Sequence, residues 1–317
     1  MASLNRRRFL GAAIGTGAAA ATAGSWVPTA AAQGGGGLNR NRQVPNNRIG
    51  IQLYTMRRLM PDGDRQAVRR ILNQLAAMGY TEVEMAGYWG FTAKQARSWI
   101  DAAGLRAVSG HDPLNIDPAS TTWQEEYKTT LENANILGQK FTGLAWWGGP
   151  YTTERFKQLA ERLDAAGALA KKAGLQFFYH NHDFEFENKQ PDGTPNYDIL
   201  LNETNPANVK FQLDLYWIID GGENPLEYLS ADPARYFAYH VKDRTWKPRP
   251  DGQNNFEDVG PGAIDFPDIF AAGLGRPKTD KHYFVEHDQP TLSHPNDPQA
   301  EIRTAQAGVT YLRNVRF

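Results

Sequence analysis

Chemically active side chains follow one apolar run after another along this chain. Seven runs end in this way, at Glu84, His111, Trp146, His180 with His182, Asp214, His240 with Lys242, and Glu286. A single Asp or His at such a position is usually a helix cap or a structural hydrogen-bonding residue, but recurrence over seven runs indicates a common site. Neutral imidazole and carboxylate ligands suit Mn²⁺, Zn²⁺, Co²⁺ or Fe²⁺, and an ion with open positions can polarise a substrate oxygen. The pattern therefore predicts one divalent metal ion as cofactor.

The composition limits what else this site can be. The 317-residue chain contains no cysteine, which excludes disulfide frameworks, thiolate metal sites and cysteine nucleophiles. Its 34 Lys and Arg residues balance 35 Asp and Glu residues, so the chain has no basic surplus that could bind a phosphate polymer or an anionic membrane surface. We therefore expect no nucleic-acid partner, and any metal must be held by His, Asp and Glu.

The elements that must position these residues alternate regularly from Arg48 onward. The expected strands are Ile49–Tyr54, Glu82–Met85, Leu105–Gly110, Phe141–Ala145, Gln176–His180, Val209–Asp214, Phe237–Val241 and Tyr283–Glu286. The expected helices are Arg65–Met78, Thr92–Ala103, Thr122–Leu137, Thr153–Ala173, Tyr197–Glu203, Pro225–Leu229, Asp265–Ala272 and Ala300–Arg313. Eight such repeats predict an α/β fold, a single closed (β/α)8 TIM barrel. An open doubly wound sheet is the alternative, but Gln52-Leu53-Tyr54-Thr55 follows the first strand where that fold has a glycine-rich loop.

The active site of such a barrel lies at the carboxyl ends of the strands. Side chains alternate between the barrel interior and the helix layer, so His180 and His182 share one face and Asn181 points the other way. Either histidine could be the metal ligand of the fifth strand. By the same alternation His287, which follows Glu286, should point away from the interior as a hydrogen-bonding histidine.

Lys242 lies on the same face as His240. It could reach the pocket as a cation that stabilises an oxyanion. The alternative is a salt bridge to Asp243 or to an acid of a neighbouring strand.

Six short motifs carry a resemblance to a known family. They are Gly-Tyr-Thr-Glu-Val-Glu (79–84), Tyr-His-Asn-His-Asp-Phe-Glu-Phe (179–186), Leu-Asp-Leu-Tyr-Trp (213–217), His-Val-Lys-Asp (240–243), Val-Gly-Pro-Gly-Ala-Ile-Asp-Phe (259–266) and Val-Glu-His-Asp (285–288). Together, from Arg48 to the C-terminus, they resemble the sugar phosphate isomerase/epimerase family of xylose isomerase-like TIM barrels. The resemblance implies a single divalent ion held by Asp214, His240 and Glu286.

The fifth strand departs from that family pattern. His180 stands where much of the family has a glutamate, so a proton shuttle between two glutamates is not expected. The histidine-rich form is similar to the subgroup of inosose dehydratase and of enzymes that cleave 3-keto-glycosides, which implies proton removal next to a ketone followed by elimination. Glu185 is the nearest remaining acid and could be a base, a substrate ligand or an exposed loop residue.

These observations lead to an interpretation of function. We expect a metal-dependent enzyme that abstracts a proton α to the carbonyl of a keto-sugar or cyclitol, with isomerisation, epimerisation or β-elimination as the outcome. The candidate catalytic residues are Glu286, His182, Lys242 and Glu185, the candidate metal ligands are His180, Asp214, His240 and Glu286, and the candidate substrate contacts are Glu84, His111, Trp146 and Trp217. Two alternatives are a non-catalytic sugar-binding barrel with a vestigial metal site and a metal-dependent endonuclease.

The N-terminal region predicts export. Asn5-Arg6-Arg7-Arg8-Phe9-Leu10 precedes a short Gly- and Ala-rich run, and residues 1–32 resemble a cleaved twin-arginine signal. This implies the twin-arginine export machinery as a partner, a periplasmic or secreted product and no membrane anchor after processing. The remaining 31 bases and 35 acids give a net charge of −4, which argues against the endonuclease. Residues 33–47 are expected to form a flexible linker, and residues 48–317 are expected to form the barrel. A homo-oligomer of this barrel is possible.

Overall fold

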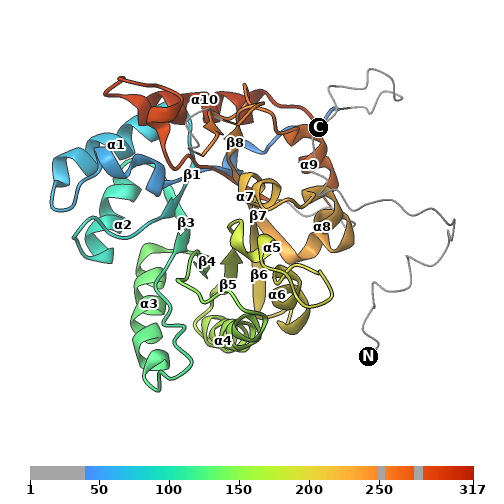
Figure 1. The fold of residues 1–317 in the computed structure, drawn as a ribbon. Coiled ribbons are helices and arrows are strands. Elements are labelled where there is room, and N and C mark those ends of the chain that lie inside the picture. Colours follow the sequence, from blue (N-terminus) through green and yellow to red (C-terminus); the bar gives the residue numbers. More distant parts are fainter. Residues whose placement is uncertain (1–39, 249–253, 275–280) are drawn as a thin grey trace, which may run out of the picture.

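The fold is a closed barrel of eight parallel strands. The computed structural model describes residues 40–248, 254–274 and 281–317. The strands follow one another around the barrel in the order β1-β10-β7-β6-β5-β4-β3-β2 (Figure 1). They are β1 Ile49–Gln52, β2 Glu82–Met85, β3 Arg106–His111, β4 Phe141–Leu144, β5 Gln176–His180, β6 Val209–Asp214, β7 Tyr236–Val241 and β10 His282–Val285. Closure confirms the predicted (β/α)8 barrel and excludes the open sheet.

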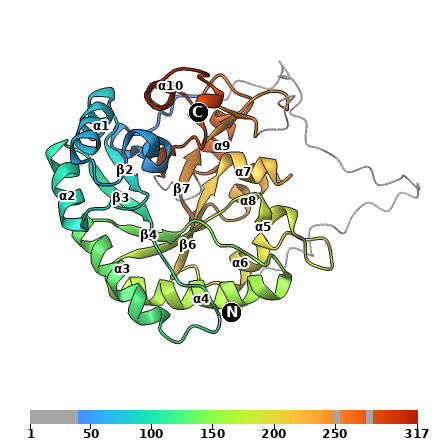
Figure 2. The ribbon, with the colours of Figure 1, turned by 60° about the vertical axis from the view of Figure 1, so that its left-hand side comes forward.

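Helices surround the barrel on its outer side (Figure 2). The principal ones are α1 Arg65–Met78, α2 Ala93–Ala102, α3 Trp123–Leu137, α4 Thr153–Lys172, α6 Tyr197–Glu203, α8 Pro225–Ala231, α9 Phe266–Ala272 and α10 Ala300–Asn314. In α4, Leu159, Leu163 and Ala166 recur at three- and four-residue spacing and are fully buried. This apolar stripe packs against the barrel, as the helical period predicts. No predicted boundary of a strand or helix differs by more than two residues from the observed one.

Short elements that the sequence analysis did not predict follow the carboxyl ends of four strands. They are a 3-10 helix at Leu53–Leu59, helix α5 at Phe184–Glu187, helix α7 at Leu215–Asp220, and a two-stranded hairpin of β8 Asp243–Arg244 with β9 Phe256–Glu257. Strand β1 was predicted to reach Tyr54 but ends at Gln52, where the 3-10 helix begins. The side chain of Gln52 caps this helix by accepting a hydrogen bond from the backbone N–H of Tyr54. Of these insertions, the 3-10 helix contributes Tyr54 and Arg57 to the lining of the cavity described below.

The barrel interior is layered. Its lower layer is an apolar cluster that includes Phe178, Ala238 and Phe284. Each of these residues lies two positions before a polar residue of the site, at 180, 240 and 286. Since residues i and i+2 of a strand share a face, the polar site rests directly on an apolar base.

Part of the segment predicted as a linker lies against the C-terminus. Residues 1–39, which include the whole predicted export signal, lie outside the described residues. Of the remaining linker residues, Arg42 forms two backbone hydrogen bonds with Phe317 (3.1 and 3.0 Å), and Val44 is 3% exposed. This segment packs on the C-terminus because the side chain of Val44 lies in the apolar core and the backbone of Phe317 forms hydrogen bonds with that of Arg42.

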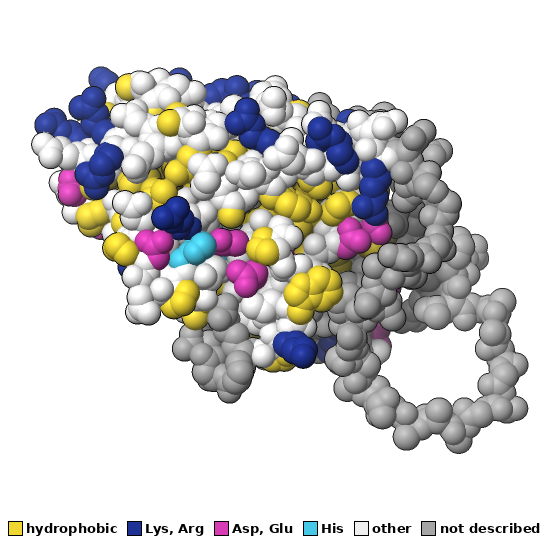
Figure 3. All heavy atoms as spheres, turned by 90° about the horizontal axis from the view of Figure 1, so that it is seen from above, with side chains coloured by type: hydrophobic (Ala, Val, Ile, Leu, Met, Phe, Trp, Pro, Cys, Tyr) yellow, Lys and Arg dark blue, Asp and Glu magenta, His cyan; other side chains and the backbone are white. Residues whose placement is uncertain are grey.

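The outer surface carries mixed charge on the face seen in Figure 3. Lys and Arg side chains there are separated by uncharged, apolar and acidic ones. Among the described residues, no helix is both long and apolar enough to cross a membrane.

Candidate active site

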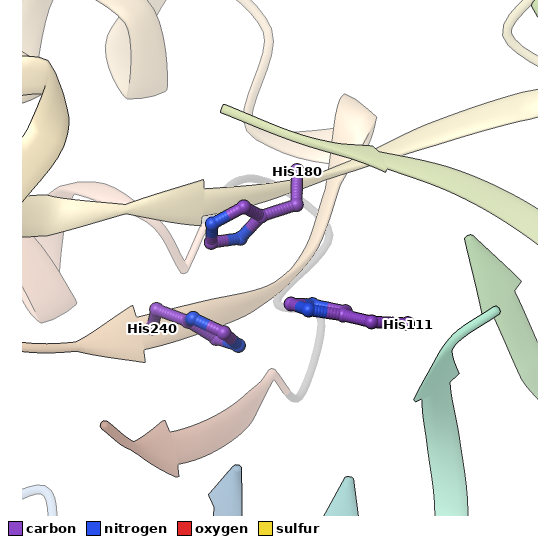
Figure 4. A group of neighbouring side chains, drawn as sticks. All are labelled: His111, His180 and His240. Atoms are coloured by element: carbon purple, nitrogen blue, oxygen red, sulfur yellow. The ribbon is translucent and has the colours of Figure 1, made fainter. Parts of the chain in front are cut away.

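Four candidate ligands converge at the carboxyl ends of neighbouring strands. One ligand atom from each of His180, Asp214, His240 and Glu286 lies within 4.8 Å of the other three, and all four residues are buried. His111 forms a second such group with His180 and His240, and Figure 4 shows these three rings reaching toward one space from β3, β5 and β7. The structure therefore brings together all four residues predicted as metal ligands, with His180 rather than His182 in the group.

Asp214 presents one oxygen to this cluster. Its Oδ1 accepts the backbone N–H groups of Tyr216 and Trp217, each at 2.9 Å, and so caps helix α7. Its Oδ2 is buried and lies 3.1 Å from Nζ of Lys242. Nδ1 of His240 lies 3.7 Å and Nε2 of His180 3.9 Å from this oxygen. A buried carboxylate oxygen that faces two imidazole nitrogens fits the first coordination sphere of a metal ion.

Glu84 orients His240 from below. Its Oε1 lies 2.5 Å from Nε2 of His240, and the carboxylate also accepts hydrogen bonds from Gln52, Ser109 and Gln212. With Nε2 donating to Glu84, Nδ1 of His240 faces Oε2 of Glu286 at 2.8 Å. A carboxylate behind the distal nitrogen is the usual partner of a metal-binding histidine.

Gln212 orients the other two histidines. Its Oε1 lies 3.1 Å from Nδ1 of His180 and 2.8 Å from Nε2 of His111. An amide oxygen can only accept, so both of these nitrogens carry their protons. Nε2 of His180 is thereby left with a lone pair on the side of Asp214. Nε2 of His180 is thus already unprotonated and faces the cluster. Nδ1 of His240 faces the same point and would become unprotonated when a metal ion replaces its proton.

Lys242 lies inside the cluster as a cation. Its Nζ is 2.8 Å from Oε2 of Glu286, 3.1 Å from Oδ2 of Asp214 and 3.0 Å from Oδ2 of Asp288. Burial alone would lower the pKa of Lys242, but the three carboxylates outweigh it and hold the pKa well above its usual value. The ammonium thus pairs with acids of neighbouring strands, which was one of the two expectations, although not with Asp243. Lys242 is not among the residues that line the cavity described below.

Electrostatics keep the cluster charged. Burial would raise the pKa of Glu286, but Lys242 and His240 hold it well below its usual range. Burial would lower the pKa of His240, but Glu286 and Glu84 raise it well above its usual value. His180 behaves oppositely, because burial and the neighbouring cations lower its pKa. An ionised carboxylate therefore lies beside one cationic and one neutral imidazole.

A cavity of about 550 Å³ opens above the cluster. His111, His180, His182 and Glu286 line it. His182 packs beside Trp217, with ring centroids 5.5 Å apart, and its Nδ1 has no hydrogen-bond partner among the described residues. Burial and the nearby Lys242 lower the pKa of His182 to about 4, so the imidazole is neutral. As the strand alternation predicted, Asn181 points elsewhere and bonds the backbone of Asp214.

Two predicted site residues have other positions. Glu84 does not reach the cavity as a substrate contact, because it is fully buried beneath His240 and every donor around it is a protein group. Glu185 is not exposed and does not line the cavity. It is fully buried behind β5, where it accepts the Tyr179 hydroxyl (2.7 Å) and the His182 backbone N–H (2.8 Å), and burial raises its pKa to about 8. The one-turn helix α5 turns this side chain inward under the loop.

The tryptophans divide between the cavity and the core. Trp146 is 60% exposed on the cavity rim, as a substrate contact would be. Trp147 is buried and donates from its indole to Tyr179. Trp217 is half-buried, and its indole nitrogen has no partner among the described residues, which leaves a donor beside His182.

The sequence analysis missed two residues of the site. Gln212 lies two positions before Asp214, so the alternation of the strand could have identified it. Asp288 belongs to a quoted motif but lies past the strand end, where alternation no longer applies. His287 points away as predicted, and its Nε2 lies 3.0 Å from Ser293 Oγ.

The glycine-rich turn before helix α9 does not form an open anion cradle. The backbone N–H groups of Gly260, Gly262 and Ile264 all donate to the carboxylate of Asp243. This accounts for the absence of an Asp243 contact to Lys242 and leaves these donors occupied.

Comparison with known proteins agrees with this geometry. Residues 72–313 match the family described as xylose isomerase-like TIM barrel. The chain belongs to this family. Among characterised members, this xylose isomerase-like barrel is 29% identical to the inosose dehydratase of Clostridium perfringens over 234 residues, which are 69% of this chain and 74% of that protein. Family membership confirms the predicted class, an enzyme acting on carbohydrates.

Solved structures of the same fold superpose on this chain. A sugar phosphate isomerase/epimerase from Parabacteroides distasonis has a TM-score of 0.69 at 26% identity, covering 84% of this chain and 98% of the other. The IolI protein, solved with a bound zinc atom, has a TM-score of 0.63 at 17% identity, covering 85% and 99%. The second likeness concerns the fold alone.

Proposed function

We propose that this barrel is an exported, divalent-metal-dependent enzyme that removes a proton α to the carbonyl of a keto-sugar or cyclitol. One observation carries the proposal, the convergence of His180, Asp214, His240 and Glu286 beneath an open cavity. The likeness to inosose dehydratase supports a carbonyl-containing ring as substrate. The zinc atom in the IolI protein supports a divalent ion, of undetermined identity.

The residues fit such an ion. Two imidazoles and two carboxylates form a mixed nitrogen and oxygen donor set, and Oδ2 of Asp214 faces a nitrogen of each imidazole. His180 and His240 are held in orientation by Gln212 and Glu84. When bound here, a divalent ion would polarise the substrate carbonyl and stabilise negative charge on its oxygen.

His182 is the favoured base. The His182 ring lines the cavity and is neutral, whereas Oε2 of Glu286 is already shared by His240 and Lys242. His182 accepts the α-proton as the C–H electron pair forms the enediolate. The Lys242 ammonium, held charged by its carboxylates, lies where it can stabilise that oxyanion.

The fate of the enediolate decides the product. Return of the proton to the other carbon gives an isomer, and return to the opposite face gives an epimer. Expulsion of a substituent on the β-carbon, which leaves with its electron pair and takes up a proton, gives elimination. The single ionised glutamate at the cavity wall, in place of two, favours elimination.

The shape of the mouth favours a substrate with a substituent beyond the reacting ring. The cavity over the cluster shares His111, Ala145 and Trp146 with a neighbouring cavity of about 630 Å³. On its other side it shares Tyr54, Arg57 and Ala86 with one of about 500 Å³. A 3-keto-glycoside would place its ketone ring over the cluster and its second group beside Trp146, and so we prefer it to a free cyclitol.

A substrate screen tests the proposal. The mature protein is loaded with Mn²⁺, Zn²⁺, Co²⁺ or Fe²⁺ and incubated in D₂O with free ketoses, inososes and 3-keto-glycosides, with Asp214→Ala as control. We expect deuterium uptake or elimination product with the wild type only. Sugar binding without turnover or deuterium uptake would instead indicate the non-catalytic sugar-binding barrel.

Export by the twin-arginine route is part of the proposal. It is supported by the Arg6-Arg7-x-Phe9-Leu10 sequence. The buried cluster of candidate metal ligands agrees with it, because this route exports proteins that fold and take up cofactors before transport. Its test is given in the Discussion.

A further inference from the structure

A second cavity lies at the opposite end of the barrel from the metal cluster. It has a volume of about 350 Å³ and adjoins the amino ends of β1, β2, β3 and β4. We call it the basal pocket, and its charged lining residues are Arg48, Arg97, Arg106, Lys140, Glu82 and Asp101, together with His282. Four cationic side chains therefore surround a recess that contains two carboxylates.

Both carboxylates of the basal pocket already have partners. Asp101 pairs with Arg97 at 2.6 Å. Glu82, which is 1% exposed, accepts a hydrogen bond from Arg106 at 2.9 Å and lies 2.6 Å from Nδ1 of His282. Arg97 and Arg106 are thereby neutralised as charges.

Arg48 has no such partner. Its Nη1 lies 2.6 Å from Nε2 of His282. A guanidinium can only donate, so Nε2 accepts, and the proton of the ring lies on Nδ1 toward Glu82. This chain of hydrogen bonds fixes the position of Arg48 but does not neutralise it, because no ion pair joins Arg48 to an acid within the described part of the chain.

Lys140 is the second uncompensated cation. It immediately precedes β4 and lines the basal pocket, and residues 40–248, 254–274 and 281–317 supply no ion pair to its ammonium. The basal pocket therefore holds a surplus of two positive charges, whereas the whole chain has a net charge of −1. Walls of Ala107, Val108 and Leu137 lower the local dielectric and strengthen this field.

We propose that the basal pocket binds a phosphate dianion, either inorganic phosphate or the phosphoryl group of a small phosphomonoester. Two surplus charges match a dianion, and donors from Arg48, Arg106 and Lys140 reach the recess from three strand ends, as the tetrahedral oxygens of phosphate require. The buried Glu82–His282 pair holds Arg48 in place before the ligand arrives. This site is separate from the metal cluster and does not depend on the proposed reaction.

Isothermal titration calorimetry with inorganic phosphate tests the site, with sodium chloride matching the ionic strength. We expect one phosphate per wild-type chain and at least tenfold weaker binding in Lys140→Gln, which alters an exposed side chain and leaves the fold intact. The matched control is Lys157→Gln, an exposed lysine on α4 that does not line the basal pocket. Arg48→Gln, with its fold checked by circular dichroism, should also lose binding.

The two phosphate sources are distinguished by repeating the titration with glycerol 1-phosphate. Tighter binding than inorganic phosphate indicates a phosphomonoester, and weaker binding indicates free phosphate. The proposal is overturned if the wild type binds neither compound, or if Lys140→Gln binds them as tightly as the wild type does.

Discussion

Oε1 of Glu84 lies 2.5 Å from Nε2 of His240, although 156 residues separate them in the chain. Barrel closure brings β2 and β7, which only β1 and β10 separate around the barrel, to one interior where their side chains meet. Glu84 thereby fixes the ring of a candidate metal ligand without touching the cavity itself.

Glu84→Gln should weaken metal affinity by about 10–100-fold, the effect usual for the outer partner of a metal-binding histidine. The amide keeps the size of the side chain but places an NH₂ group against the donors of Ser109 and Gln212. Competition with a chromophoric chelator measures the affinity. Glu301→Gln, which alters a buried carboxylate on α10, serves as control, and equal affinity in both variants would contradict this role.

Replacing Asp214, His240 or Glu286 by Ala should remove the ion or reduce turnover by orders of magnitude. The fold should survive, because one polar side chain at the barrel mouth contributes little apolar burial. Metal content by mass spectrometry and helicity by circular dichroism check both parts. If Asp214→Ala and His240→Ala still hold a stoichiometric ion, the metal site lies elsewhere.

His180→Glu should retain metal, since a carboxylate can occupy the same position in the cluster. It restores a second glutamate near Glu286 and should move the product ratio from elimination toward epimerisation. Product analysis by NMR in D₂O reports the ratio, and metal content is measured alongside. An unchanged ratio in a metal-loaded variant would show that residue 180 does not direct the reaction.

Lys281 gives the protein a pH-dependent stability. Its Nζ is buried against the carbonyls of Pro233 and Tyr236, and burial lowers its pKa from 10.5 to about 8. Between pH 8 and 10.5 the unfolded chain binds the proton and the folded chain does not, so this residue makes stability rise with pH through that window. The cost of burying the charge is fully present below pH 8.

Urea denaturation of wild type and Lys281→Met at pH 7.5 and 9.5 measures this effect. From pH 7.5 to 9.5 the free energy of unfolding of the wild type should rise by about 1–2 kcal/mol relative to that of the variant, because one pKa unit corresponds to about 1.4 kcal/mol. Lys157→Met, altered at an exposed lysine, should show no such gain. A constant difference between wild type and Lys281→Met would contradict the lowered pKa.

Arg6→Lys combined with Arg7→Lys should keep the protein in the cytoplasm with its signal uncleaved. The twin-arginine pathway requires both guanidinium groups, whereas the following position is variable. Arg8→Lys is therefore the matched control and should be exported normally. Cell fractionation and N-terminal sequencing provide the measurement, and export of the double variant at the wild-type level would exclude this pathway.

The sequence by itself determined the elements and the faces of the strands. Helical and strand periods are local properties, so α1, β2, β5, β6 and α6 begin and end at the predicted residues. Alternation placed His180 inward and Asn181 outward, since a strand has a fixed period of two. Those two facts placed His180, Asp214, His240 and Glu286 among the residues at the strand ends, and the family resemblance singled out Asp214, His240 and Glu286 as metal ligands.

Only the tertiary structure decided which groups these side chains meet. Glu84 and Glu185 were predicted to face substrate, but the first lies beneath His240 and the second is turned behind β5 by an unpredicted helical turn. The partners of Lys242 and the charge surplus around Arg48 likewise became visible only in the closed barrel. The physical reason is that these contacts join residues from strands far apart in the chain, and their meeting depends on the stagger with which eight strands close, which no local pattern encodes.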